Sequence, residues 1–141
     1  MNYDEEKKTI KDFTDLNSWK EGHELVLEIY KATKLFPKNE QFSLTDQIQR
    51  AVVSITSNIA EGFSRTSAKE KVQFYRTALG SLTETQNQLL IARDVHYLNQ
   101  QNFDRIFSQS IVVSKLLNGL IKKTKTFLNW YCLMFYPYHD S

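Results

Sequence analysis

The sequence contains few of the residues that interrupt helices or crosslink a chain. It has only four glycines and two prolines, and Pro37 and Pro137 both fall at the ends of helical patterns rather than inside them. This scarcity favours long helices over a β fold with many turns. The single cysteine, Cys132, cannot form an internal disulfide, and the opening residues lack the apolar run of a signal peptide. We therefore expect a cytoplasmic protein.

Size and composition indicate one domain. A chain of 141 residues with 41% hydrophobic content can build a core without disulfides or metals. Its net charge of +2 is unevenly distributed: residues 1–46 carry seven Lys/Arg against ten Asp/Glu, whereas residues 105–141 carry five against one. This asymmetry favours an electrostatic role for the C-terminal part, although a solvated helix face produces charge runs too.

Apolar periodicity predicts an all-α fold, an antiparallel up-down-up-down four-helix bundle. Helices are expected over about 16–36, 43–61, 67–95 and from residue 99 or 102 onward. Three short links between them make consecutive helices antiparallel neighbours. The bundle is assigned to residues 15–126, between a flexible N-terminal segment (1–14) and an aromatic C-terminal extension (127–141).

Individual residues mark the predicted helix boundaries. Asp15 has the position and chemistry of an N-cap for the first helix. Ser43 and Ser67 each stand three residues before an acidic residue, which predicts capping boxes for the second and third helices. Gly62 is expected to end the second helix, because glycine enters the left-handed conformation without steric cost.

The predicted interior is defined by apolar and small residues. The second helix carries a seam at spacings of four, three and four: Ile48, Val52, Ile55 and Ile59. The inner face of the first helix is expected to hold Leu16, Trp19, Val26, Ile29, Tyr30 and Thr33. A glycine inside a helix costs roughly 1 kcal/mol relative to alanine. Three such glycines are therefore interpreted as points of close backbone approach: Gly22, Gly80 and Gly119.

Motifs that carry catalysis are missing. None of His23, His96 and His139 follows a glutamate at the spacing that di-metal bundles use. The sequence also has no phosphate-binding loop, no dinucleotide fingerprint and no nucleophile elbow. Cys132 lies in an apolar run, which is typical of a small buried hydrophobe. We expect a protein that is not an enzyme and that has no metal site and no cofactor.

A polar stripe runs along the second helix beside the apolar seam. It recurs in steps of three or four residues: Gln47, Arg50, Ser54, Asn58 and Glu61. Such a stripe either faces water or forms a hydrogen-bonded interface with another helix or another subunit.

These residues carry a family resemblance that covers roughly residues 13–125. The runs Gln47-Ile48-Gln49-Arg50-Ala51, Ser57-Asn58-Ile59-Ala60-Glu61-Gly62 and Ala78-Leu79-Gly80-Ser81-Leu82 resemble the signature of four-helix-bundle proteins encoded in intervening sequences of bacterial 23S rRNA genes. Two positions depart from it, since family members commonly have proline in place of Thr56 and often glycine in place of Ser43. The ending after Lys125 is outside the pattern.

The resemblance implies a homo-oligomer, a pentameric ring of bundles, and a link to RNA or DNA. Related accessory proteins of diversity-generating retroelements bind nucleic acid and a reverse transcriptase. The candidate phosphate-binding residues in this sequence are Arg50, Arg65, Lys69, Lys71, Arg76, Lys115, Lys122, Lys123 and Lys125. The alternative is an assembly module that binds another protein and no nucleic acid.

The aromatic run from Phe127 to Tyr136 is the most apolar part of the chain and is too short to span a membrane. Behind a lysine cluster it could anchor at a membrane surface, but burial between subunits explains exposed aromatic residues equally well. We favour the contact between subunits.

Overall fold

The computed structural model describes residues 9–135, without the side chains of residues 128–133 and 135. Within this range the chain forms four α-helices, two short 3-10 helices and no strand. The helices are α1 (Asn17–Thr33), α2 (Leu44–Ser64), α3 (Ala68–Asp94) and α4 (Gln100–Phe135), and the 3-10 helices are η1 (Phe13–Asp15) and η2 (Lys38–Glu40). The predicted all-α four-helix fold is confirmed.

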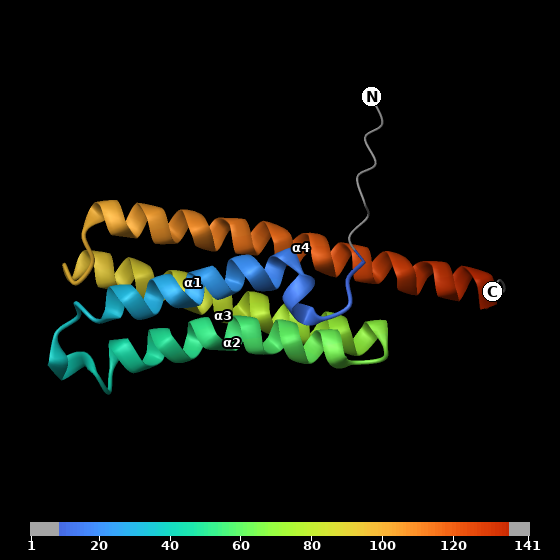
Figure 1. The fold of residues 1–141 in the computed structure, drawn as a ribbon, viewed down its shortest axis with the longest axis horizontal. Coiled ribbons are helices and arrows are strands. Elements are labelled where there is room, and N and C mark those ends of the chain that lie inside the picture. The colour runs from blue at the N-terminus through green and yellow to red at the C-terminus, as the bar shows by residue number, and fades with distance from the viewer. Residues whose placement is uncertain (1–8, 136–141) are drawn as a thin grey trace, which may run out of the picture.

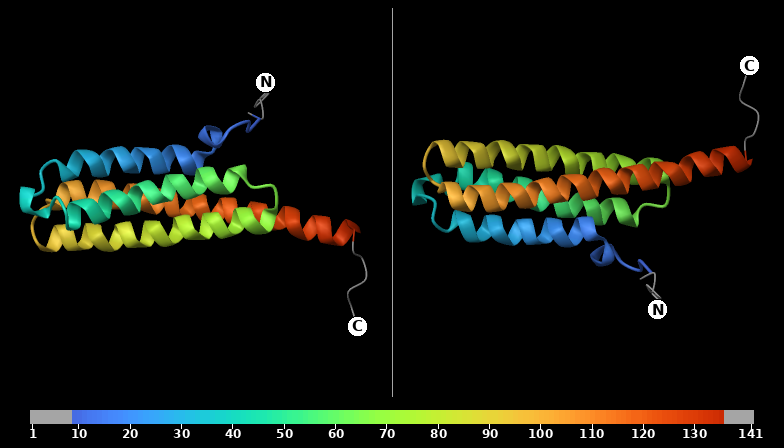
Figure 2. Two further views of the ribbon diagram at one scale, coloured as in Figure 1. Left: turned by 90° about the horizontal axis from the view of Figure 1, so that it is seen from below. Right: turned by 90° about the horizontal axis from the view of Figure 1, so that it is seen from above.

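The helices lie side by side, and each contacts the helix before and after it in the chain (Figure 1). The contact of α1 with α4 closes the bundle. The α1–α2 and α3–α4 links lie at one end, here called the double-connector end (residues 34–43 and 95–99). The α2–α3 link lies at the opposite, single-connector end (residues 65–67). The helix α4 continues past its neighbours at the single-connector end (Figure 2).

The core runs along the centre of the bundle. The α2 seam is fully buried, as the spacing predicts, and it packs with Leu25 of α1 and Leu117 of α4. Full burial of such a side chain contributes about 1.5–3 kcal/mol. On α1 the predicted burial is confirmed for Ile29 and Thr33 and is wrong for Tyr30, which is 43% exposed, because the buried line of this helix passes through Leu25.

Two helix starts differ from the prediction. The N-cap of α1 is Leu16, without a side-chain bond, whereas Asp15 belongs to η1 and accepts hydrogen bonds from the backbone of Lys11 and Asp12. Ser43 makes no capping hydrogen bond with its side chain. The carboxylate of Glu40 in the preceding 3-10 helix accepts the N–H of Leu44 instead, at 3.2 Å.

The later caps follow the sequence more closely. Ser67 Oγ accepts the N–H of Glu70 at 3.1 Å, which confirms the predicted cap of α3. Asn99 Oδ1 accepts the N–H of Asn102 at 2.8 Å, so Asn99 is the capping asparagine of α4. The first helix ends at Thr33 rather than at Phe36, because the chain tightens into 3-10-type bonds before Pro37.

The glycines divide into two kinds. Gly62 does not end α2, which continues to Ser64, and no glycine has a positive φ. A Cβ at Gly62 would lie 2.7 Å from Tyr75 Cε1, so this position needs glycine for close packing; Gly22 likewise faces Thr56 Cγ2 at 3.2 Å. Gly80 and Gly119 have no atom within 4 Å of such a Cβ, so the predicted close approach is wrong for them within this chain.

Several predictions concern residues outside the described part. Residues 1–8 of the predicted flexible segment, residues 136–141, Pro137 and His139 lie outside it, as does the side chain of Cys132. Residues 9–12 lead into η1, where the Phe13 ring packs edge-on against Trp19 at 5.5 Å. The helix α4 continues through residue 127 to Phe135.

Candidate functional site

The single-connector end gathers positive charge from two distant parts of the sequence. The link between α2 and α3 and the first turn of α3 carry Arg65, Lys69 and Lys71, while α4 brings a lysine run to the same end. Lys71 and Lys123 line one cavity there, although 52 positions separate them in the sequence. We call this group the basic cluster: Arg65, Lys69, Lys71, Lys122, Lys123 and Lys125.

The cavity beside the basic cluster has a volume of about 350 Å³. Four segments build it: the N-terminal segment contributes Ile10, the end of α2 contributes Phe63, α3 contributes Tyr75, and α4 contributes Leu120 and Phe127. Its lining is therefore mainly apolar and aromatic, with lysines from two helices among it. Tyr75 is only 2% exposed, whereas Phe127 is 69% exposed.

Lys71 is held in place by the end of α2. Its Nζ donates to the carbonyl oxygen of Phe63 at 2.6 Å and approaches that of Gly62 at 3.5 Å. These are carbonyls of the last helical turn of α2, and that of Gly62 also accepts the N–H of Arg65 at 3.2 Å. Partial burial lowers the pKa of Lys71, because it penalises the charged form. This ammonium both caps α2 and places a positive charge at the cavity wall.

The other members of the cluster differ in how they are engaged. Arg65 forms an ion pair with Glu61 at 2.5 Å and stacks over the Phe74 ring at 4.7 Å. The four remaining members are exposed lysines at the surface of α3 and α4. The cluster therefore includes several cations that water, or a bound anion, can reach.

Three predicted phosphate-binding residues lie elsewhere. Arg50 is near the start of α2, toward the double-connector end, and forms an ion pair with Asp46 at 3.0 Å. Arg76 on α3 and Lys115 on α4 are exposed farther along the bundle. The structure thus places six of the nine candidates in segments at the single-connector end, where Lys71 and Lys123 line one cavity, and leaves these three farther from it.

The polar stripe of α2 is divided between two environments. Ser54 and Asn58 are half-buried beside α3, where Ser54 Oγ shares a 2.8 Å hydrogen bond with Ser81 Oγ and Asn58 Nδ2 donates to the Ser54 carbonyl at 2.8 Å. Gln47, Arg50 and Glu61 are exposed.

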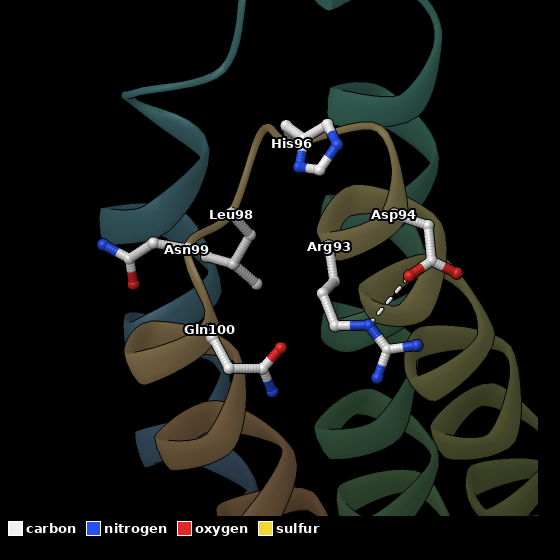
Figure 3. A pocket seen from close by; sticks show the side chains of 6 residues that line it. All are labelled: Arg93, Asp94, His96, Leu98, Asn99 and Gln100. Carbon is white, nitrogen blue, oxygen red and sulfur yellow. Dashed lines mark hydrogen bonds and ion pairs between the residues drawn. The ribbon is translucent and has the colours of Figure 1, made fainter.

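A larger depression, of about 640 Å³, lies at the double-connector end (Figure 3). Its polar side chains already serve local structure. Arg93 pairs with Asp94 at 2.8 Å and covers the Phe103 ring at 4.6 Å. Asn99 caps α4. Gln100 Nε2 donates to Asp104 Oδ1 at 2.8 Å, one turn later in the same helix. We therefore place the candidate site at the basic cluster.

His96 lines the same depression and ends α3 in a conformation that sequence reasoning missed. Its φ is +66°, in the left-handed region where glycine is usual. The N–H of His96 donates to the Arg93 carbonyl, and the N–H of Tyr97 donates to the Ala92 carbonyl, the two bonds of a Schellman motif. The usual signal, a glycine at this position, is missing from the sequence.

A hydrogen bond ties the two connectors of this end together. The hydroxyl of Tyr97 donates to Glu40 Oε1 at 3.0 Å, and the Tyr97 ring lies 5.7 Å from that of Phe36. The backbone N–H of Leu44, and then the Tyr97 hydroxyl, lower the pKa of Glu40, because both donate to its carboxylate. The same bond raises the pKa of Tyr97.

The described residues contain neither a cluster of metal ligands nor a helix that could span a membrane. Among residues 9–135, no three or more His, Cys, Asp or Glu side chains are grouped as metal ligands. None of the helices in this range is both long and apolar enough to cross a bilayer.

The fold and the site define an antiparallel four-helix bundle with a cationic cavity at one end. Residues 14–119 match the family of 23S rRNA-intervening sequence proteins, and the chain belongs to this family. Its fold is similar to that of a Bacteroides thetaiotaomicron protein of unknown function from the S23 ribosomal protein family, with a TM-score of 0.69 and 25% identity over 74% of this chain and 98% of that chain. No curated protein matches the sequence.

Proposed function

We propose that this protein is a non-enzymatic, oligomeric helical bundle that binds nucleic acid through its phosphate backbone. The observation that carries the proposal is the meeting of two basic segments at one end of the bundle, around Lys71 and Lys123. Lysine and arginine contacts to phosphates dominate binding that is independent of sequence. Membership of the 23S rRNA-intervening sequence family, whose genes lie within ribosomal RNA genes, supports the same proposal.

The balance of charged side chains around the basic cluster also supports phosphate binding there. The acidic side chains next to the cluster are engaged nearby, Glu61 with Arg65 and Glu70 with the hydroxyl of Ser67. The exposed lysines outnumber them and lie on two helices. An excess of exposed lysines on two helices supports attraction of a polyanion to this end of the bundle.

The test is a salt series of binding to structured RNA, single-stranded RNA and duplex DNA. A K122Q/K123Q/K125Q variant should bind more weakly, and its slope of log K against log salt should be shallower by about 2 on single strands, since each phosphate contact contributes roughly 0.7. The matched control, K31Q/K34Q/K38Q, removes the same charge at the double-connector end and should leave the slope unchanged. Binding that is independent of salt, or no binding at low salt, would contradict the proposal.

The oligomer, a pentameric ring by resemblance, is proposed to use the outer face of α2 and α3. Gly80 is exposed in the middle of α3, where a glycine costs roughly 1 kcal/mol without any packing reason inside this chain. Close approach of a second copy supplies such a reason. Val53 and Ile91 are exposed apolar residues of the same two helices.

Native mass spectrometry tests the oligomer directly. Wild type should have the mass of five chains, and Gly80→Leu should dissociate the ring. Gly119→Leu, at an equally open glycine of α4, is the control and should leave the mass unchanged. A monomeric wild type would refute the proposal.

A second candidate function is an assembly module that binds another protein. The exposed apolar side chains of Leu35 and Phe42 at the double-connector end favour it, at 77% and 90% exposure. A pull-down with and without nuclease separates the two functions, because a protein partner that stays bound after nuclease digestion supports the module.

A further inference from the structure

The cavity at the single-connector end has a property that phosphate binding does not require. Contacts to a phosphate backbone need only exposed cations, whereas the lining of this cavity includes the aromatic residues Phe63 and Phe127 and the nearly buried Tyr75. Phe127, in the C-terminal part of α4, is 69% exposed. Phosphate contacts alone therefore do not explain an exposed aromatic residue in a cavity that two lysines also line.

We propose that this cavity receives an unpaired nucleobase, so that the protein prefers single-stranded nucleic acid to a duplex. The inference rests on the proposed function and adds the class of nucleic acid. Unpaired bases stack on aromatic side chains independently of sequence, whereas the bases of a duplex are already stacked inside it. Cations beside the cavity would contact the phosphates on either side of the inserted base.

The arrangement of the lining residues fits this ligand. Lys123 and Phe127 are four residues apart on α4 and so share one side of the helix. Lys71 faces the cavity from α3, with its ammonium held by the Phe63 carbonyl at 2.6 Å and lying 5.2 Å from the centre of the Phe63 ring. One cavity thus combines aromatic surface with a cation from each of two helices.

Size and polarity agree with a base as well. A volume of about 350 Å³ is near the lower end of the range, about 300–1,000 Å³, that small-molecule sites occupy. The hydroxyls of Thr66 and Thr124 are among the lining groups and can accept hydrogen bonds from a base edge. Such contacts orient a base without reading a sequence.

The experiment compares Phe127→Ala with Phe42→Ala, which removes an exposed ring at the opposite end. Each variant and the wild type are titrated with a fluorescein-labelled unstructured 20-mer RNA, the DNA of the same sequence, and the RNA duplex. Phe127→Ala should bind both single strands about tenfold more weakly and the duplex within about twofold of wild type, since aromatic stacking is the term removed. Phe42→Ala should match wild type, and Phe127→Trp should restore binding.

Other results would overturn the inference. If Phe127→Ala weakens single strands and duplex equally, or neither, while the salt dependence of wild type persists, the base-binding role fails and phosphate binding stands. A changed native mass for Phe127→Ala, with unchanged affinity, would assign the ring to a subunit contact instead. If wild type binds none of the three probes at low salt, both proposals fail.

Crosslinking with RNA that contains 4-thiouridine tests independently where the base binds. Crosslinked peptides should contain Phe63 or Phe127, and their yield should fall in Phe127→Ala. Crosslinks confined to the double-connector end would place the base elsewhere and contradict the inference.

Discussion

The two ends of this bundle are built by the same four helices but are finished in different ways. At the double-connector end, two links lie next to each other and satisfy each other's polar groups, as in the bond from Tyr97 to Glu40. At the single-connector end, a link of three residues leaves an apolar cavity and a group of exposed lysines. One end is therefore closed by contacts between its own links, while the other leaves the exposed lysines on which the proposed binding function depends.

The largest effect on stability is expected at the single-connector end, from Gly62→Ala. Its Cβ would lie 2.7 Å from Tyr75 Cε1 and 2.9 Å from Phe74 Cβ, so α2 and α3 must separate. Overpacking of this kind should lower the free energy of unfolding by about 3 kcal/mol, and urea denaturation of the variant and wild type would measure this loss. Gly119→Ala, with open space around it, should instead gain up to about 1 kcal/mol. A loss below about 1 kcal/mol for Gly62→Ala would show that Tyr75 and Phe74 can move to accept the added methyl group.

His96→Gly at the double-connector end should stabilise the protein by about 1 kcal/mol. The φ of +66° is strained for histidine and free of strain for glycine. Nucleic-acid affinity should not change in this variant, because the basic cluster lies at the opposite end of the bundle. His96→Ala keeps the strain and removes the imidazole, so a gain from alanine equal to that from glycine would rule out backbone strain as the cause.

The smallest effect is a pH dependence at Glu40. Hydrogen bonds from Leu44 and Tyr97 lower its folded pKa below the ordinary 4.5, so the folded state favours the carboxylate. The resulting stability is present above about pH 4.5 and is lost as the pH falls through the folded value. Denaturation from pH 7 to 3 should therefore show a smaller acid loss in Glu40→Gln than in wild type. Equal acid losses would contradict this role.

Features that depend on local pattern could be predicted from the sequence. The α2 seam is buried where its spacing places it, and Ser67 caps α3 because a cap depends on residues three apart. The cap of α2 was missed because Glu40 supplies it from a 3-10 helix that lies before the expected Ser43. Two nearby side chains can each cap the same helix, and the backbone geometry of the connector decides which of them does so.

The sequence by itself determined the helical fold and the nine basic candidates, because helical periodicity and charge can be read along the chain. Only the tertiary structure decided which candidates meet. Lys71 and Lys123 share a cavity because the lengths of α3 and α4 bring both to one end, whereas Arg50 remains near the other. The need for glycine at position 62 likewise comes from Tyr75 on the next helix. Contacts between distant residues depend on helix length and packing, and no local pattern encodes them.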